Sequence, residues 1–245
     1  METFYLSMPW GKMAYYSSES SGAAHAMIFL HGTGCDSSEW EKVIARLPPD
    51  ARLIRMDFRG HGNSSVPSEP FTLTDLATDV IKLAEYLNLQ QPILAGHSLG
   101  GMAAMAAAQK AFQPGALILA EGWTNLKNAA KAFREPRFFG RLDPMNIKEI
   151  QKKNEKTIAR FQPEVWDYFW QSVQVFDAGD FLESTSLPIR EIYGNLGRIE
   201  TTRRNLLIPS KPNIELIWLN DAGHYLPVEK SLELADICRR VLETC

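Results

Sequence analysis

Residues 92–102 read PILAGHSLGGM, and this stretch decides which fold the sequence favours. Residues 93–95 are apolar and typical of the end of a buried strand, whereas residues 102–111 are rich in Ala and favour a helix. Gly-x-Ser-x-Gly between a strand and a helix is the pattern of a nucleophile elbow. Such a turn holds its middle residue, here Ser98, in a strained backbone conformation that exposes the hydroxyl above the sheet. The N–H groups at the start of the helix point to the same place, where negative charge would develop.

Composition is consistent with one large α/β domain that carries an insertion. The chain has 245 residues, of which 45% are hydrophobic, enough for a sizeable core. Lys and Arg number 26 against 29 Asp and Glu, a net charge of −3. This balance gives no electrostatic reason to expect a nucleic acid or an anionic membrane as partner. We expect a small-molecule substrate and a monomer or homodimer.

The cysteines and the N-terminal residues predict a cytoplasmic protein. Cys35, Cys238 and Cys245 have no metal-binding spacing and are too few for a disulfide framework. The first residues lack the basic and then apolar pattern of a signal peptide, and no apolar run approaches the ~20 residues of a membrane helix.

Apolar runs alternate with helical patterns along most of the chain. This alternation predicts a mostly parallel eight-stranded sheet that is flanked by helices. The expected strands are residues 3–7, 12–17, 25–30, 52–57, 93–95, 116–120, 189–193 and 214–219, and the expected helices are residues 37–47, 74–89, 102–111 and 229–242.

Residues 124–186 interrupt this alternation. Strand patterns vanish there, and Pro136, Pro144 and Pro163 separate what we expect to be several short helices. The sequence thus predicts a core domain of residues 1–123 and 187–245 and a helical cap, or lid, of residues 124–186.

Aromatic residues at and within the cap are predicted to line an apolar pocket above Ser98. The candidate substrate-binding residues are Trp123, Phe138, Phe139, Trp166 and Trp170. An apolar acyl or alcohol group is the expected ligand. The alternative is that Arg134, Arg137 and Arg141 hold a carboxylate of the substrate.

Four short motifs occur in an order that resembles the α/β-hydrolase superfamily. They are HGTG at 31–34, DFRGHGNS at 57–64, GHSLGG at 96–101 and AGH at 222–224. The resemblance implies an α/β-hydrolase fold with Ser98 as nucleophile and a helical lid. It also implies an oxyanion hole formed by the N–H groups of Thr33 and of Leu99, the residue after the nucleophile.

Only one of the five histidines follows the last predicted strand, where the family places its base. His25 begins a strand, His61 lies in a glycine-rich loop, and His31 precedes the oxyanion loop. His97 is next to the nucleophile, so its side chain should point away from it. His224 is therefore the predicted general base.

The acid of the triad departs from the usual family pattern. Residues 193–198 read YGNLGR and contain no carboxylate, and Gly197 stands where the family usually has Asp. Some superfamily members place the acid after the preceding strand, which is Glu121 here. A charge at the end of a buried strand must find a partner. Glu200, Asp221 and the absence of any acid are the alternatives.

These residues together predict a cofactor-independent serine hydrolase, without a metal, that acts on a small apolar carboxylic ester. The reaction would use a Ser-His-Glu triad and an acyl-enzyme. Ser at the elbow argues against haloalkane dehalogenases and epoxide hydrolases, which would need Asp there. A carbon–carbon bond hydrolase, a lactonase and a perhydrolase share the same residues. A weakly catalytic ligand-binding receptor is the alternative from another class.

Overall fold

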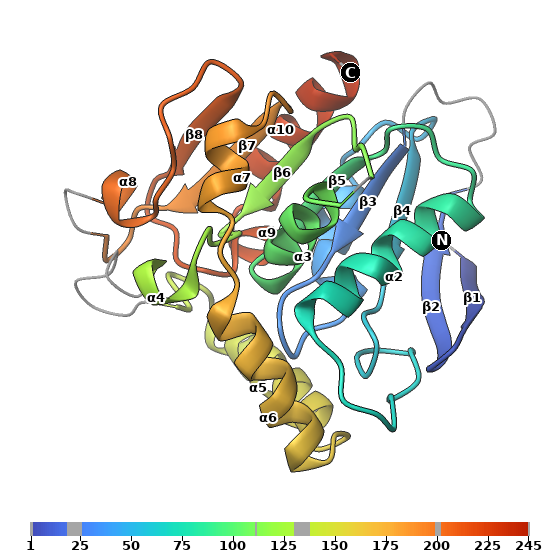
Figure 1. The fold of residues 1–245 in the computed structure, drawn as a ribbon. Helices are drawn as coiled ribbons and strands as arrows, with labels where there is room; N and C mark the ends of the chain where they lie inside the picture. The colour runs from blue at the N-terminus through green and yellow to red at the C-terminus, as the bar shows by residue number, and fades with distance from the viewer. Residues whose placement is uncertain (1, 19–25, 111, 130–137, 199–201, 245) are drawn as a thin grey trace.

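The structure is a computed structural model that describes residues 2–18, 26–110, 112–129, 138–198 and 202–244. Within these residues, eight strands form one sheet in the order β1-β2-β4-β3-β5-β6-β7-β8 (Figure 1). β1 and β2 form an antiparallel hairpin, β2 is antiparallel to β4, and every later pair is parallel. The strands are β1 (Glu2–Met8), β2 (Gly11–Ser17), β3 (Ala26–Leu30), β4 (Arg52–Met56), β5 (Ile93–His97), β6 (Leu117–Ala120), β7 (Ile189–Gly194) and β8 (Ile214–Leu219). The predicted mostly parallel eight-stranded sheet is confirmed.

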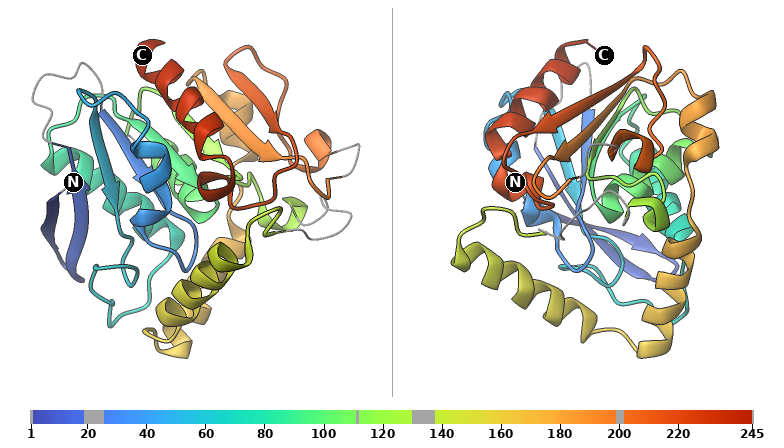
Figure 2. Two further views of the ribbon diagram at one scale, coloured as in Figure 1. Left: turned by 180° about the vertical axis from the view of Figure 1, so that it is seen from behind. Right: turned by 90° about the vertical axis from the view of Figure 1, so that its left-hand side faces the viewer.

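Helices cover both faces of the sheet (Figures 1 and 2). One face packs against α2 (Leu73–Tyr86), α3 (Leu99–Ala108) and α7 (Gly179–Ser184). The other packs against η1 (Ser37–Trp40), α1 (Glu41–Ile44), α9 (Leu226–Glu229) and α10 (Ser231–Thr244). The alternation of side chains along a strand explains this division, because Leu94 packs on the first face while Ile93 and Ala95 pack on the second.

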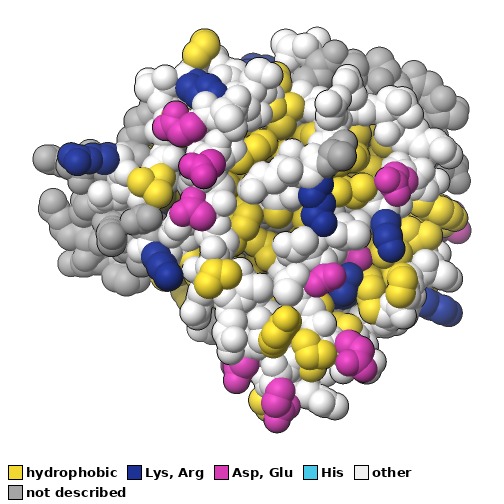
Figure 3. Space-filling view, in the orientation of Figure 1, with side chains coloured by type: hydrophobic (Ala, Val, Ile, Leu, Met, Phe, Trp, Pro, Cys, Tyr) yellow, Lys and Arg dark blue, Asp and Glu magenta, His cyan; other side chains and the backbone are white. Residues whose placement is uncertain are grey.

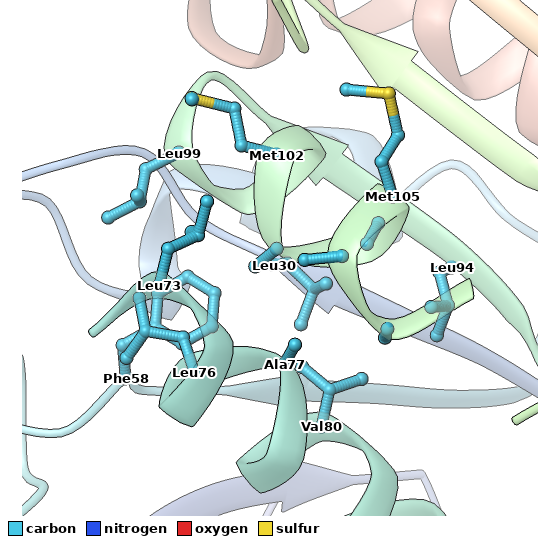
Figure 4. Close-up of a cluster of buried hydrophobic side chains, with 14 of the residues drawn as sticks. Leu30, Phe58, Leu73, Leu76, Ala77, Val80, Leu94, Leu99, Met102 and Met105 are labelled. Carbon is cyan, nitrogen blue, oxygen red and sulfur yellow. The ribbon is translucent and has the colours of Figure 1, made fainter. Parts of the chain in front are cut away.

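The core beneath the elbow joins α2 and α3 to the central strands. Figure 4 shows Leu30 and Leu94 from the sheet in one buried cluster with apolar side chains from both helices, among them Leu76 and Val80 of α2 and Met105 of α3. α3 is buried along nearly its whole length, which its run of Ala and Gly permits. It begins at Leu99, three residues earlier than the sequence pattern indicated, because the elbow itself is the first turn of the helix.

The helices between β6 and β7 are α4 (Leu126–Ala129), α5 (Pro144–Ile158), α6 (Pro163–Val175) and α7. Pro144 and Pro163, which the sequence indicated as breaks, each occupy the first turn of a helix, where the missing N–H costs nothing. α5 and α6 form a V that projects away from the sheet (Figure 2, right). The short α8 (Thr202–Asn205) follows β7.

Each arm of the V contacts a different part of the core. Lys153 on α5 pairs with Asp36 at 3.4 Å beside η1. On α6, Phe169 stacks on Phe71 with ring centroids 4.8 Å apart, and the hydroxyl of Ser172 accepts from the Leu73 N–H at 2.9 Å.

The surface in Figure 3 carries hydrophobic and charged side chains side by side, and Lys/Arg and Asp/Glu are interspersed on this face. Among the described residues, no helix combines the length and the apolar character needed to cross a membrane.

The elbow depends on a missing side chain at Gly96. A Cβ there would lie 2.4 Å from the backbone carbonyl carbon of Gly100 at the start of α3. We predict that Gly96→Ala lowers the free energy of unfolding by about 1–3 kcal/mol. For a domain of this size, this corresponds to roughly 2–12 °C in melting temperature, measured by circular dichroism.

Gly179→Ala is the matched control. A Cβ at Gly179 would meet only the Asp177 carboxylate, at 3.0 Å, and this flexible side chain can move. An unchanged melting temperature in Gly96→Ala would contradict the account of the elbow.

Candidate active site

Three side chains from three strand ends lie in one hydrogen-bonded row. Ser98 follows β5, Glu121 follows β6 and His224 follows β8. His224 Nε2 lies 3.0 Å from Ser98 Oγ, and His224 Nδ1 lies 3.3 Å from Glu121 Oε2. An ionised Glu121 accepts the Nδ1 proton, which leaves Nε2 to accept from the Ser98 hydroxyl. The residues that the sequence singled out as nucleophile, base and acid are thus in mutual contact.

The backbone at Ser98 is strained in the way that an elbow requires. Its φ is 52° and its ψ is −114°, a conformation that residues with a side chain rarely adopt. The Ser98 N–H donates to the Ala120 carbonyl at 3.0 Å, which ties the elbow to the neighbouring strand. The strain therefore fixes the hydroxyl at the start of α3, above the carboxyl edge of the sheet.

Glu121 is fully buried, with 0% of its surface exposed. Its carboxylate accepts from the Gly194 N–H at 2.9 Å, and Arg198 Nη2 contacts both of its oxygens. Arg198 is itself only 4% exposed and donates from Nε to the Gly194 carbonyl at 3.0 Å. The loop after β7, which carries the acid in the usual family pattern, thus carries a cation that binds an acid from the end of the preceding strand, β6.

The sequence pattern alone does not indicate this role of Arg198. The available signal was the buried charge expected at Glu121, which requires a partner, together with a basic residue in YGNLGR. Of the two alternative positions for the acid, the structure describes only Asp221. Asp221 pairs with Arg141 at 2.9 Å, where both side chains are more than half exposed. Glu200, like Arg134 and Arg137, lies outside the described residues.

Burial and charge set the protonation states of this row. Burial alone would raise the pKa of Glu121, but the hydrogen bond from His224 and the charge of Arg198 outweigh it and lower that pKa. Burial lowers the pKa of His224 below 6.5, and the nearby charges of His97 and Arg198 add to this effect against the opposing Glu121. At neutral pH the row therefore holds a carboxylate and a neutral imidazole.

The backbone next to Ser98 offers two candidate N–H donors. Leu99 is the first residue of α3, where N–H groups have no acceptor within the helix. Thr33 follows β3, and both residues border the same cavity as Ser98. The backbone before Thr33 passes close to the His97 ring. Position 32 therefore requires glycine, because a Cβ there would lie 2.8 Å from His97 Nδ1.

A cavity of about 270 Å³ opens above Ser98. Its apolar and aromatic lining comes from the elbow helix, the segment after β6, α6 and the segment around His224. The lining residues are Gly32, Thr33, His97, Ser98, Leu99, Met102, Trp123, Leu126, Phe138, Trp170, Val173, His224 and Tyr225. Trp123, Phe138 and Trp170 of the predicted substrate-binding set are among them.

Phe139 and Trp166 lie outside this lining, so the cavity gives no support to the prediction that they bind substrate. Phe139 stacks on Tyr225 with ring centroids 5.5 Å apart and nearly parallel rings. Trp166 packs against Phe161 at 5.0 Å and Phe169 at 5.7 Å, where α6 meets the core. Sequence spacing gives no means of separating side chains that line a cavity from those one layer behind it.

Two further histidines form hydrogen bonds with the backbone of nearby loops. His31 Nδ1 donates to the Gly32 carbonyl at 2.7 Å, and His31 Nε2 accepts from the Phe58 N–H at 3.1 Å. His61 Nδ1 lies 3.0 Å from the Arg59 carbonyl. In the described part of the chain, no group of His, Cys, Asp or Glu is arranged to hold a metal ion.

Comparison with known proteins identifies the family. The sequence profile described as the alpha/beta hydrolase family matches residues 27–237. The chain belongs to the alpha/beta hydrolase family.

One curated relative of this alpha/beta hydrolase is a 3-oxoadipate enol-lactonase from Acinetobacter baylyi, with 39% identity over 77 residues. This match covers 31% of the present chain and only 29% of the length of that relative. A putative esterase/lipase from Haemophilus influenzae is 24% identical over 237 residues, which cover 83% of this chain and 78% of that protein.

Solved structures share the fold over nearly the whole chain. The enol-lactonase from Burkholderia xenovorans LB400 has a TM-score of 0.77 and 23% identity, and the comparison covers 98% of this chain and 99% of the other. At this level of identity, the likeness establishes the fold and leaves the substrate open.

The Arg198–Glu121 pair gives a prediction about stability. We expect Arg198→Met to lower the free energy of unfolding by about 3–5 kcal/mol, because it leaves a buried carboxylate without its cation. Arg141→Met is the control, since it removes an arginine from an exposed pair and should change stability by less than about 0.5 kcal/mol. Urea unfolding at neutral pH measures both.

The pH dependence of this loss has a definite sign. The folded pKa of Glu121 is below 4.5, so the stability from its ionised form is present above pH 4.5 and is lost as the pH falls through that lower value. The difference in free energy of unfolding between wild type and Arg198→Met should therefore become smaller as the pH falls. Equal losses in the two variants at neutral pH would contradict the assigned role of Arg198.

Proposed function

We propose that this protein is a serine hydrolase that cleaves a small, apolar carboxylic ester through Ser98, His224 and Glu121. The observation that carries the proposal is the hydrogen-bonded row of these residues, with 3.0 Å from Ser98 Oγ to His224 Nε2 and 3.3 Å from His224 Nδ1 to Glu121 Oε2, at the floor of an apolar cavity. A serine hydroxyl needs a base within such reach to act as nucleophile at neutral pH.

The proposed reaction has two halves. Ser98 Oγ attacks the ester carbonyl carbon while His224 Nε2 takes its proton, and the resulting oxyanion accepts hydrogen bonds from the N–H groups of Thr33 and Leu99. Collapse of this intermediate expels the alcohol, which receives the proton from His224. Water then attacks the acyl carbon while His224 Nε2 takes a proton from it. The bond from this carbon to Ser98 Oγ breaks, Oγ receives the proton from His224, and the carboxylic acid is released.

Glu121 orients His224 and stabilises its protonated form during both halves. Arg198 and the Gly194 N–H keep this carboxylate ionised and fixed. The absence of a carboxylate at Gly197 was the reason to consider a weakly catalytic receptor. A buried carboxylate from β6 that contacts His224 favours the hydrolase, because the base then has its orienting acid.

The cavity supports a neutral substrate. Its volume of about 270 Å³ suits a short acyl chain or a small ring, and Trp123, Phe138 and Trp170 provide apolar surface. Among the described lining residues there is no Lys, Arg, Asp or Glu, and His97, which pairs with Glu39, is only 1% exposed. A lactone is the second candidate, because an enol-lactonase is among the relatives and a lactone would react by the same steps.

The first test is covalent labelling of Ser98. A fluorophosphonate probe should modify Ser98 in the folded protein, and Ser98→Ala should abolish both the label and the turnover of a p-nitrophenyl ester without loss of fold. The labelling rate should fall in acid with a midpoint below pH 6.5, because the pKa of His224 is lowered. Peptide mass spectrometry that finds no adduct on Ser98 would overturn the proposal.

The second test is the acyl-chain preference. From acetate to butanoate esters, kcat/KM should rise by up to about fourfold per added methylene, and should level off once the cavity is full. Val173→Ala should shift the optimum to a longer chain, because Val173 lines the cavity. Val175→Ala is the control, since Val175 is 74% exposed on the same helix.

A ligand with a carboxylate distinguishes the alternatives. Succinate monoesters should react more slowly than butanoate esters in an apolar cavity. A preference for succinate, or a fall in kcat/KM from acetate onward, would contradict a neutral apolar substrate.

A further inference from the structure

A second histidine lies directly beneath the proposed site. His97 precedes Ser98 in the chain, is 1% exposed and makes two hydrogen bonds through its ring. Its Nε2 lies 2.9 Å from the backbone carbonyl oxygen of His224, and its Nδ1 lies 3.0 Å from Glu39 Oε1. The proposed reaction does not use His97, so these contacts require another explanation.

The hydrogen-bond partners indicate that His97 is an imidazolium. A carbonyl oxygen can only accept, so Nε2 carries a proton. The other oxygen of Glu39 accepts from the Gly32 N–H at 2.9 Å, as a carboxylate does. When Glu39 is ionised, Nδ1 must also donate, and His97 is positively charged.

The pKa directions agree with this geometry. Burial alone would lower the pKa of His97, but the charge of Glu39 outweighs it and raises that pKa. Burial would raise the pKa of Glu39, but the charge of His97 outweighs it and lowers that pKa. The two groups therefore form a buried ion pair.

This pair connects three segments that surround Ser98. Glu39 holds Gly32, which precedes the candidate oxyanion donor Thr33. His97 belongs to the strand that ends at the elbow, and it holds the backbone of His224. One ion pair thus fixes the relative positions of the oxyanion loop, the elbow and the base.

The charge of His97 also acts on the base. The ring centroids of His97 and His224 are 4.9 Å apart, so a proton on His97 opposes a second proton on His224. The charge of Arg198 also opposes protonation of His224, whereas Glu121 favours it. The ring of Tyr225 lies 5.7 Å from His97, and His31 and Cys35 lie near Glu39.

We infer that Glu39 and His97 are positioning residues for this active site, and that the imidazolium of His97 keeps His224 unprotonated and ready to act as base. The inference rests on the proposed function, because it assigns His224 as the base. It differs from a purely structural ion pair in one measurable respect, since only a charge that acts on His224 moves the pH at which activity is lost.

The pH profile of kcat/KM tests this inference with two variants of opposite sign. Glu39→Gln removes the anion that keeps His97 charged, so His224 should bind a proton more readily. The acid limb should move up by on the order of one pH unit. Glu121→Gln removes the anion that stabilises protonated His224, so the acid limb of this variant should move to lower pH.

Glu41→Gln is the matched control. It makes the same change two residues further along, on a side chain that is 59% exposed and outside the site, and it should leave the profile unchanged. A loss of kcat/KM in Glu39→Gln that is equal at every pH, with an unmoved limb, would overturn the inference. In that case the proposed function would still hold, provided that Ser98→Ala abolishes the activity.

NMR of the histidine ring nitrogens tests the inference on the wild-type protein alone. It requires no activity assay and does not depend on whether a variant folds. In the wild-type protein, both ring nitrogens of His97 should remain protonated at about pH 7, while His224 should be a neutral ring with its proton on Nδ1. A neutral His97 under these conditions would overturn the inference.

Discussion

The site depends on one buried charge, the carboxylate of Glu121 at the end of β6. A fully buried carboxylate is costly unless it is paired and hydrogen-bonded. Here Arg198, the Gly194 N–H and the His224 ring supply its partners. These partners come from the loops after β7 and β8, so the requirement to satisfy Glu121 also fixes the loop that carries His224. The same contacts that compensate the charge therefore organise the site.

Three residues at the same edge of the sheet have a strained backbone. Ser98, Glu121 and Trp123 all have φ close to +53° although none is glycine, with values of 52°, 54° and 54°. Such conformations cost on the order of 1–3 kcal/mol each and persist only where the surroundings determine them. The parallel strands and the buried helix α3 are the rigid frame that holds them. This frame presents the hydroxyl of Ser98 and the ring of His224 to the cavity.

Local sequence determines most of the fold, and long-range packing determines the finer parts of the site. Runs such as AMIFL in β3 are buried on both faces and could be assigned to strands from their composition alone. The elbow could be predicted because its glycines and serine are contiguous. Arg198 could not, because it meets Glu121 across 77 positions. Spacing also does not reveal that Trp166 packs against Phe161 and not in the cavity lining. Residues that act through tertiary contacts alone require the structure.

The most direct test of the central claim is a crystal structure of the protein after reaction with an alkyl phosphonate. The account predicts a bond from phosphorus to Ser98 Oγ, with the phosphonyl oxygen about 2.7–3.1 Å from the N–H groups of both Thr33 and Leu99. The alkyl chain should lie against Trp123 and Trp170, and Glu121 should remain bound to His224 and Arg198. A phosphonyl oxygen that faces solvent, or a base that contacts a different carboxylate, would contradict the account.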